Sequence, residues 1–273
     1  MKTSPPTIAR ADLIEGMAKG MAVLESFDVQ RQRLNASLAA ERAGITRAAA
    51  RRHLLTLAHL GYLDSDGRYF WLSPKVLRFS GSFLASSRLP RAVQPTLNRL
   101  SAQTGESFSV AVLDGHEVVI VGRSGYTASS AGAPGVSSPR VQAYGLHLGA
   151  RLPAHATSTG RMLLAGLSAA QLKRWIDERL MDGSLPRLTA HTLTQPAAFK
   201  RALAQARRDD YCVARQEHEL GVHALAVPLR DAQGRTVAAL NWVNSADRMQ
   251  EPALQREWLP LLLDAAAQLR PLL

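Results

Sequence analysis

Side chains that can bind DNA are concentrated in one short stretch of the chain, residues 35–75. Guanidinium and hydroxyl groups in the first turn of a helix can reach phosphates and base edges, and small residues there let the helix approach closely. The candidate DNA contacts of these types are Asn35, Thr46, Arg47, Ala48, Ala49, Arg51, Arg52 and Arg68. A helix with arginines on one side is often only a solvated face, so the surrounding elements must support this interpretation.

The surrounding elements have the order of a winged helix-turn-helix. Gly44 follows a short helical pattern where a C-cap needs positive φ, and Thr46 offers its hydroxyl as the next N-cap. The apolar positions of this second helix share one face and are Ala50, Leu54 and Leu57. Asp66-Gly67 is a turn signal between two short strands, with Arg68 at its tip. This order is typical of DNA-binding domains.

Composition and charge agree with a nucleic-acid partner without identifying it. The chain has 273 residues and a net charge of +11, and residues 31–75 hold eight Lys or Arg against three Asp or Glu, a surplus of five. This balance favours anionic partners. Cys212 is the only cysteine, which excludes an intramolecular disulfide and argues against a cysteine-based metal site. We therefore assign no metal site and no cofactor.

Hydropathy and patterning predict a soluble, cytoplasmic protein with two domains. No signal-peptide core and no segment of membrane-spanning length is present in the sequence. We expect a disordered tail over residues 1–10, the DNA-binding domain over 11–73, a linker helix over 74–90, and a second domain over 91–273.

The second domain is predicted to be of mixed α/β type, with a mainly antiparallel sheet. After a break at Arg88-Leu89-Pro90, a helix is expected to resume at Val93 and end near Gly105. Strands are expected at 108–112, 117–122, 141–146, 224–229 and 236–243, and helices near 161–167, 169–181, 196–208 and 253–269. Residues 124–140, rich in Gly, Ser, Ala and Pro, are expected to form a flexible loop.

A second group of residues suited to bind a ligand surrounds the start of the helix near residue 161. Free N–H groups and the positive end of the helix dipole collect at such a start and favour a small carboxylate. The residues concerned are His155, Thr157, Ser158, Thr159 and Gly160. Alternatively, Thr157 or Ser158 only caps the helix.

Several segments together resemble the IclR family of transcriptional regulators over nearly the whole chain. They are residues 19–27, the helix-turn-helix with Leu-Gly-Tyr at 60–62, and residues 152–165, 217–222 and 226–235. Residues 55–57, 68–77 and 109–115 further resemble the branch of PcaU, PcaR and PobR, which responds to aromatic acids such as protocatechuate and 4-hydroxybenzoate and controls aromatic degradation.

The resemblance implies an α+β protein in which a winged helix-turn-helix is joined by a linker helix to a GAF-like effector domain. It implies a homodimer or homotetramer on double-stranded operator DNA, and RNA polymerase as a partner if the protein is an activator. The further pocket residues that it implies are Arg215, Val222, His223, Ala224, Asn241 and Val243. Of these, Arg215 and His223 are the candidates to pair with an acid, whereas Asn241 could instead be a strand residue facing water.

Other functions fit the sequence less well. Within the family, the effector could be a non-aromatic organic acid. An enzyme with an accessory DNA-binding domain would need a reactive constellation, and no nucleophile elbow, Walker loop or His-Glu-x-x-His motif occurs. Glu217-His218-Glu219 offers alternating metal ligands without evident partners, so we interpret it as a solvated loop. A DNA-packaging protein would explain the charge but not the large second domain.

Overall fold

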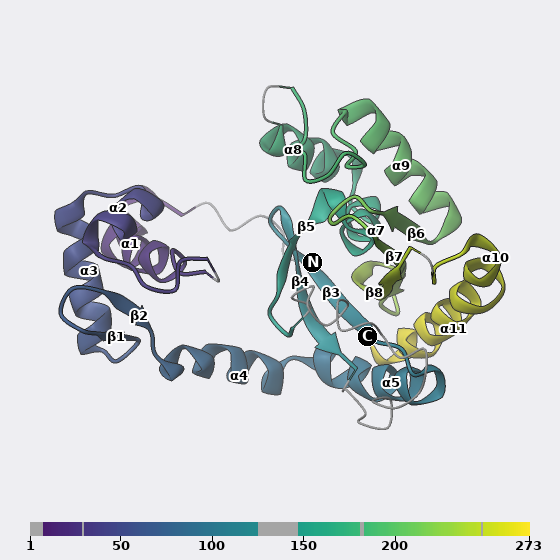
Figure 1. The fold of residues 1–273 in the computed structure, drawn as a ribbon, viewed down its shortest axis with the longest axis horizontal. Coiled ribbons are helices and arrows are strands. Elements are labelled where there is room, and N and C mark those ends of the chain that lie inside the picture. Colours follow the sequence, from purple (N-terminus) through teal and green to yellow (C-terminus); the bar gives the residue numbers. More distant parts are fainter. Residues whose placement is uncertain (1–7, 29, 125–146, 181–182, 247) are drawn as a thin grey trace. The chain divides into compact units, whose positions relative to one another are not determined.

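The chain forms two compact units that divide between residues 85 and 86 (Figure 1). The structure is a computed structural model and describes residues 8–28, 30–124, 147–180, 183–246 and 248–273. The expected tail up to residue 7, nearly all of the expected loop at 124–140 and the expected strand at 141–146 lie outside these ranges. Within them, no helix is long and apolar enough to cross a membrane.

The N-terminal unit is a helical domain that carries a two-stranded antiparallel hairpin (Figure 1). An isolated bridge between Leu34 and Phe70 attaches the hairpin to the segment before α2. Its elements are η1 (Arg10–Asp12), α1 (Glu15–Leu24), α2 (Ala36–Ala43), α3 (Arg47–His59), β1 (Leu63–Ser65), β2 (Phe70–Leu72), η2 (Pro74–Val76) and α4 (Leu77–Ser86). The winged helix-turn-helix expected from the sequence is therefore confirmed.

The turn between α2 and α3 has the chemistry that the sequence predicts. Gly44 has a φ of 64°, and the Thr46 hydroxyl accepts a hydrogen bond from the Ala49 N–H at 3.3 Å. At the start of α2, Asn35 Oδ1 accepts from two N–H groups of the first turn at 3.0 Å each. The carbonyl oxygen of this candidate DNA contact is thus occupied as a helix cap. The helices enclose a core that includes Val23, Leu34, Ala50, Leu54, Leu57 and Phe70.

The end of α3 is fastened to the start of α4 by polar and aromatic contacts. The Lys75 ammonium donates to the Leu60 carbonyl at 2.6 Å and lies 4.9 Å from the centroid of the Tyr62 ring. Tyr62 stacks on Phe79 of α4 with centroids 5.6 Å apart. The Ser73 hydroxyl also donates to the Gly61 carbonyl at 2.5 Å. These contacts tie the direction of α4 to that of α3.

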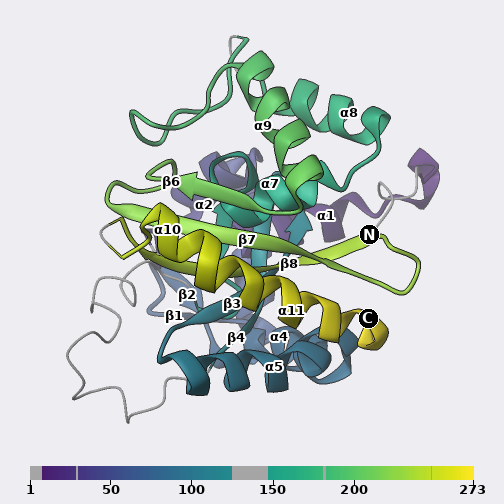
Figure 2. The same cartoon turned by 90° about the vertical axis from the view of Figure 1, so that its right-hand side faces the viewer.

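The C-terminal unit is a three-layer domain around an antiparallel sheet (Figure 2). Among the described residues the sheet has the strand order β5-β4-β3-β8-β7-β6. Its strands are β3 (Phe108–Asp114), β4 (Glu117–Arg123), β5 (Arg151–Pro153), β6 (Cys212–Arg215), β7 (Val222–Arg230) and β8 (Thr236–Ser245). Its helices are α5 (Arg88–Thr104), η4 (Ala154–Ala156), α7 (Ser158–Ala165), α8 (Ala169–Arg179), α9 (Pro196–Asp209), α10 (Glu251–Ala253), η5 (Leu254–Trp258), α11 (Leu259–Leu269) and η6 (Arg270–Leu272).

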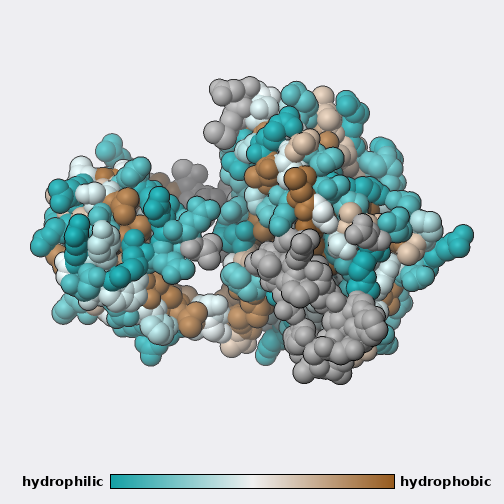
Figure 3. Space-filling model, viewed as in Figure 1, coloured by the Kyte–Doolittle hydropathy of each residue, from teal (hydrophilic) through white to brown (hydrophobic). Residues whose placement is uncertain are grey.

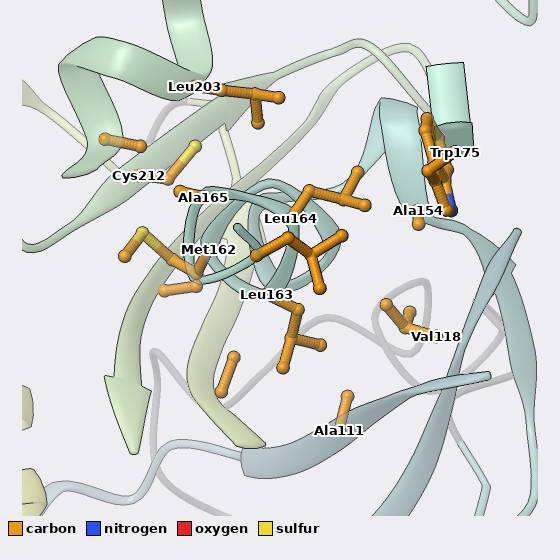
Figure 4. Close-up of a cluster of buried hydrophobic side chains, with 14 of the residues drawn as sticks. Ala111, Val118, Ala154, Met162, Leu163, Leu164, Ala165, Trp175, Leu203 and Cys212 are labelled. Carbon is orange, nitrogen blue, oxygen red and sulfur yellow. The ribbon is translucent and has the colours of Figure 1, made fainter. Parts of the chain in front are cut away.

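Helices cover both faces of this sheet (Figure 2). One apolar core joins one face of the sheet to α7, α8 and α9, and a second core joins the other face to α5 and α11. Figure 4 shows the first core, where Met162, Leu163 and Leu164 lie among side chains from the sheet and from the outer helices. All eight residues of α7 are buried, so this helix lies inside the domain.

The structure differs from the sequence expectations in the linker helix and in two short strands, β5 and β6, which the sequence did not predict. Residues 74–90 do not form one helix, because Ser87 is extended (φ −74°, ψ 130°) and separates α4 from α5. The break therefore lies before Arg88, and Pro90 is accommodated in the first turn of α5, where its missing N–H has no helical partner to lose. The strands β5 and β6 have three and four residues, too few to show an alternating pattern in the sequence.

Gly160 is required for the close approach of α7 to the segment before it. A Cβ atom built at this residue would lie 2.0 Å from the Ala154 carbonyl oxygen. The oxygen belongs to the backbone and cannot turn away as a side chain would. Close packing therefore accounts for Gly160, which the sequence analysis had grouped with candidate ligand contacts.

We predict that Gly160→Ala destabilises the C-terminal unit by about 3 kcal/mol, because overpacking of this kind strains the backbone. Urea unfolding followed by tryptophan fluorescence measures the effect, since three of the four tryptophans lie in this unit, at positions 175, 242 and 258. Gly16→Ala in α1 is the control: no atom lies within 4 Å of its Cβ, so it should be neutral or slightly stabilising. An unchanged unfolding midpoint for Gly160→Ala would contradict the packing argument.

The fold favours the neutral form of four histidines in the C-terminal unit. Burial lowers the pKa of each from the ordinary value of 6.5, and these residues are His116, His155, His218 and His223. His155 is fully buried, and its Nε2 lies 2.8 Å from the Pro186 carbonyl oxygen. Folding thus opposes protonation of these rings.

We predict that the C-terminal unit loses stability between pH 7.5 and pH 5.5. The unfolded chain binds more protons than the folded one once the pH falls below about 6.5, so the free energy of unfolding decreases towards acid pH. Urea midpoints at the two pH values test this. A variant with His218→Gln and His223→Gln should lose part of the dependence, and a midpoint that rises at pH 5.5 would refute the prediction.

Candidate functional sites

The exposed side of α3 carries a row of unpaired basic side chains. Arg47, Arg51 and Arg52 are all exposed, and none of the ion pairs among the described residues involves their guanidinium groups. Ala48 is exposed as well and Ala49 is half-buried, which leaves the start of the helix free of bulky groups. Figure 3 shows the largely hydrophilic surface of the N-terminal unit in that view. This side of α3 can meet phosphates and base edges.

The wing is held by an arginine that the sequence analysis did not identify. Arg33 forms an ion pair with Asp66 at 2.5 Å, and its guanidinium carbon lies 4.5 Å from the centroid of the Trp71 ring. Arg68, the expected wing residue, is exposed and lies 5.4 Å from the centroid of Tyr69. Arg33 could not be found from local spacing, because Asp66 is 33 residues away along the chain. Arg33 thus orders the wing beside α3.

The N-terminal unit also exposes large apolar side chains. Ile14, which precedes α1, and Met17 of α1 are 67% and 68% exposed, and Leu77 and Phe79 of α4 are 65% and 59% exposed. Apolar exposure on this scale within short helices is typical of surfaces that another protein covers.

A cavity that is partly open to solvent lies beside the start of α7 in the C-terminal unit. The segments around it are β5, η4, the start of α7, β6 with the loop that follows it, β7 and β8. The lining residues are Leu152, Ala156, Thr157, Ser158, Thr159, Ala214, Glu217, His218, Glu219, Val222, Ala224, Asn241 and Val243.

The hydroxyl groups at the start of α7 have different roles. The Thr157 hydroxyl accepts from the Gly160 N–H at 3.2 Å and donates to the Pro153 carbonyl at 3.2 Å, so Thr157 is the cap of the helix. Ser158 is only 1% exposed, and its Oγ has no hydrogen-bond partner among the residues that the structure describes. Buried polar atoms are rarely left unpaired. The cap interpretation therefore explains Thr157 and leaves Ser158 available to a ligand.

Asn241 faces the cavity from β8 and is oriented by a neighbouring strand. Its Oδ1 accepts a hydrogen bond from the buried Ser109 hydroxyl of β3. Because the amide oxygen is occupied, the NH₂ group is the part of this side chain that remains for another acceptor. Asn241 is buried within the sheet, so the alternative of a strand residue exposed to bulk water is excluded.

Glu217, which lines the cavity, belongs to a buried ion pair. The Arg161 guanidinium, from α7, donates to Glu217 Oε1, and the two side chains are 5% and 8% exposed. Within the described parts of the chain, the second carboxylate oxygen, Oε2, has no hydrogen-bond partner. The Thr192 hydroxyl donates to the Glu217 carbonyl at 2.7 Å and fixes the backbone at this point. The expectation of a solvated loop is therefore wrong for Glu217, whose partner lies 56 residues away in the sequence.

Strand register determines which of the other expected ligand contacts face the cavity. Val222, Ala224 and Val243 line the cavity as expected, but Arg215 and His223 do not. These two are paired across β6 and β7, on the sheet face opposite Ala214 and Ala224, because successive side chains alternate. Arg215 is bound there to Glu251 at 2.6 Å. His155, bound to the Pro186 carbonyl, is likewise absent from the lining.

Burial and ion pairing limit the charge of the side chains that line the cavity. Burial lowers the pKa of His218, which favours the neutral ring at physiological pH. Glu219 is exposed, whereas the charge of Glu217 is balanced by Arg161. Among the described residues, no group of three His, Cys, Asp or Glu side chains could hold a metal ion.

Comparison with protein-family models places both units in one family. The bacterial transcriptional regulator IclR C-terminal model matches residues 82–270, and the IclR helix-turn-helix domain model matches residues 16–67.

Similar proteins with assigned roles come from Acinetobacter. The Pca operon regulatory protein of Acinetobacter baylyi is 48% identical over 99% of this chain and 93% of its own length. The p-hydroxybenzoate hydroxylase transcriptional activator of the same organism is 49% identical over 98% of this chain and 95% of its own length. The crystal structure of a double mutant of the PobR inducer-binding domain from Acinetobacter, in complex with 3-hydroxybenzoic acid, is 46% identical. It covers 67% of this chain and 98% of that domain, with a TM-score of 0.58.

Proposed function

Because the chain belongs to the IclR family of bacterial transcriptional regulators, we propose that α3 and the wing read an operator and that the cavity binds a small aromatic carboxylate. The chain is accordingly a DNA-binding regulator and not an enzyme. The effector, the residues that bind it and the assembly of the protein are the parts that we propose.

The observation that carries the proposed effector is the unpaired Ser158 hydroxyl at the start of α7. The first turn of a helix leaves N–H groups without intrahelical acceptors, and here the first two residues of α7, Ser158 and Thr159, line the cavity. A carboxylate would accept from these groups and from the Ser158 hydroxyl, in the favourable field of the helix dipole. The Asn241 NH₂ group is a further donor.

The apolar part of the lining favours an aromatic acid over a small aliphatic one. Leu152, Val222, Ala224 and Val243 contribute apolar walls, which a flat ring can cover more fully than a two- or three-carbon acid. The names of the similar proteins support this choice, since they refer to p-hydroxybenzoate and to bound 3-hydroxybenzoic acid. A non-aromatic organic acid remains the alternative that a ligand panel tests.

Operator binding requires two or more copies of the chain. In this mode the start of each α3 enters a major groove, and phosphate contacts supply affinity while the first turn supplies specificity. The exposed apolar residues of α1 and α4, including Met17 and Phe79, are suited to contact a second copy. Effector binding would then change the spacing or orientation of the paired winged domains.

We predict that Arg52→Ala weakens operator binding by about 1–3 kcal/mol, because it removes a side chain that reaches bases or phosphates. Mobility-shift titration at fixed salt measures the change. Arg201→Ala, an exposed arginine of α9 in the other unit, is the matched control and should leave affinity unchanged. Equal affinity of Arg52→Ala and the unmutated protein would count against this docking.

For the cavity, we predict that Ser158→Ala combined with Asn241→Ala lowers affinity for aromatic acids about tenfold or more, because two donors to the ligand are lost. DNA binding by the ligand-free protein should persist. Calorimetry with a panel of benzoates and aliphatic acids provides the measurement, with Ser37→Ala on the exposed side of α2 as control. Binding of aliphatic acids with no heat from any benzoate would reject the aromatic assignment.

A further inference from the structure

We propose that Glu217 selects aromatic acids that carry a ring hydroxyl, by accepting a hydrogen bond from that hydroxyl through its free carboxylate oxygen. The inference rests on the proposed binding of an aromatic acid in the cavity. It adds a second recognition point, on a different segment from the start of α7.

The first support is that, among the described residues, half of the Glu217 carboxylate has no hydrogen-bond donor. Oε1 is bound by Arg161, whereas Oε2 is buried and no described residue donates to it. Glu217 is also one of the residues that line the cavity. A buried acceptor that lacks a donor carries the full cost of its desolvation, which a donor from a bound molecule would remove.

The second support is that Glu217 cannot turn away to find another partner. Its side chain is held by Arg161, a residue of the fully buried helix α7. Its backbone is held by the Thr192 hydroxyl, and the preceding carbonyl, of Gln216, accepts from the Thr189 hydroxyl at 2.7 Å. The carboxylate is therefore preorganised, and a ligand must adapt to it.

The chemistry of an ion-paired carboxylate decides what the ligand must offer. An ionised carboxylate only accepts hydrogen bonds, so a phenolic O–H is suitable, whereas a methoxy group offers only an acceptor. Arg161 balances the charge of Glu217, which reduces repulsion of an anionic ligand in the same cavity. Bonds from a hydroxyl to a carboxylate are short and strong.

A ligand series on the full-length protein tests this inference separately from the proposed function. Calorimetry compares benzoate, 3- and 4-hydroxybenzoate, 3- and 4-aminobenzoate, and 3- and 4-methoxybenzoate. We expect at least one hydroxybenzoate to bind about tenfold or more tightly than benzoate and both methoxybenzoates, and an aminobenzoate to regain part of the difference. Affinities within threefold across the series would overturn the role of Glu217 and leave the aromatic assignment standing. Absence of binding by every member would overturn both.

A variant at Glu217 gives a measured affinity ratio that a purely structural role of this residue would not change. Glu217→Gln should lower the affinity ratio of the preferred hydroxybenzoate to benzoate at least threefold, because a neutral amide is a weaker acceptor than a carboxylate. Glu219→Gln, in the same segment but exposed, is the matched control and should keep the ratio. General damage to the cavity would weaken both ligands equally and leave the ratio unchanged, which would refute the inference. If Glu217→Gln does not fold, the ligand series on the unmutated protein decides whether Glu217 has the proposed role.

Discussion

The buried ion pair between Arg161 and Glu217 is the interaction on which the cavity depends. Two charges removed from water are tolerated only when they are paired with good geometry, and loss of one partner leaves the other uncompensated. The pair therefore fixes where the segment after β6 crosses the start of α7. It also fixes the distribution of donors and acceptors in the cavity, where the Ser158 hydroxyl and the second carboxylate oxygen of Glu217 have no hydrogen-bond partner among the described residues.

Complete burial of α7 shields the polar groups at the start of this helix from bulk water. In an exposed helix, water would satisfy the first N–H groups and the Ser158 hydroxyl. Here the sheet lies on one side of the helix and α9 packs on another, and Gly160 lets the helix touch the preceding segment. Water is thereby limited to the cavity, so a ligand that replaces it there meets donors that are already oriented.

The two units divide the tasks of the regulator. In the N-terminal unit, Lys75 and the stacked rings of Tyr62 and Phe79 join the end of α3 to α4, so the direction of α4 is tied to that of α3. Arg33 similarly joins the segment before α2 to Asp66 and Trp71 of the wing. Short, packed connections of this kind favour a few discrete arrangements of the elements that they join over a continuous range of positions.

The sequence by itself determined what depends on neighbours within one helix or turn: the Gly44 cap, the Thr46 cap, the apolar face of α3, the hairpin at Gly67 and the hydroxyl-rich start of α7. It also carried the family resemblance. Only the tertiary structure decided which distant residues meet. Strand register turned Arg215 and His223 away from the cavity, and packing brought Glu217 to Arg161 across 56 residues. Local spacing encodes periodicity and capping, whereas burial and pairing between remote segments arise only when the layers pack together.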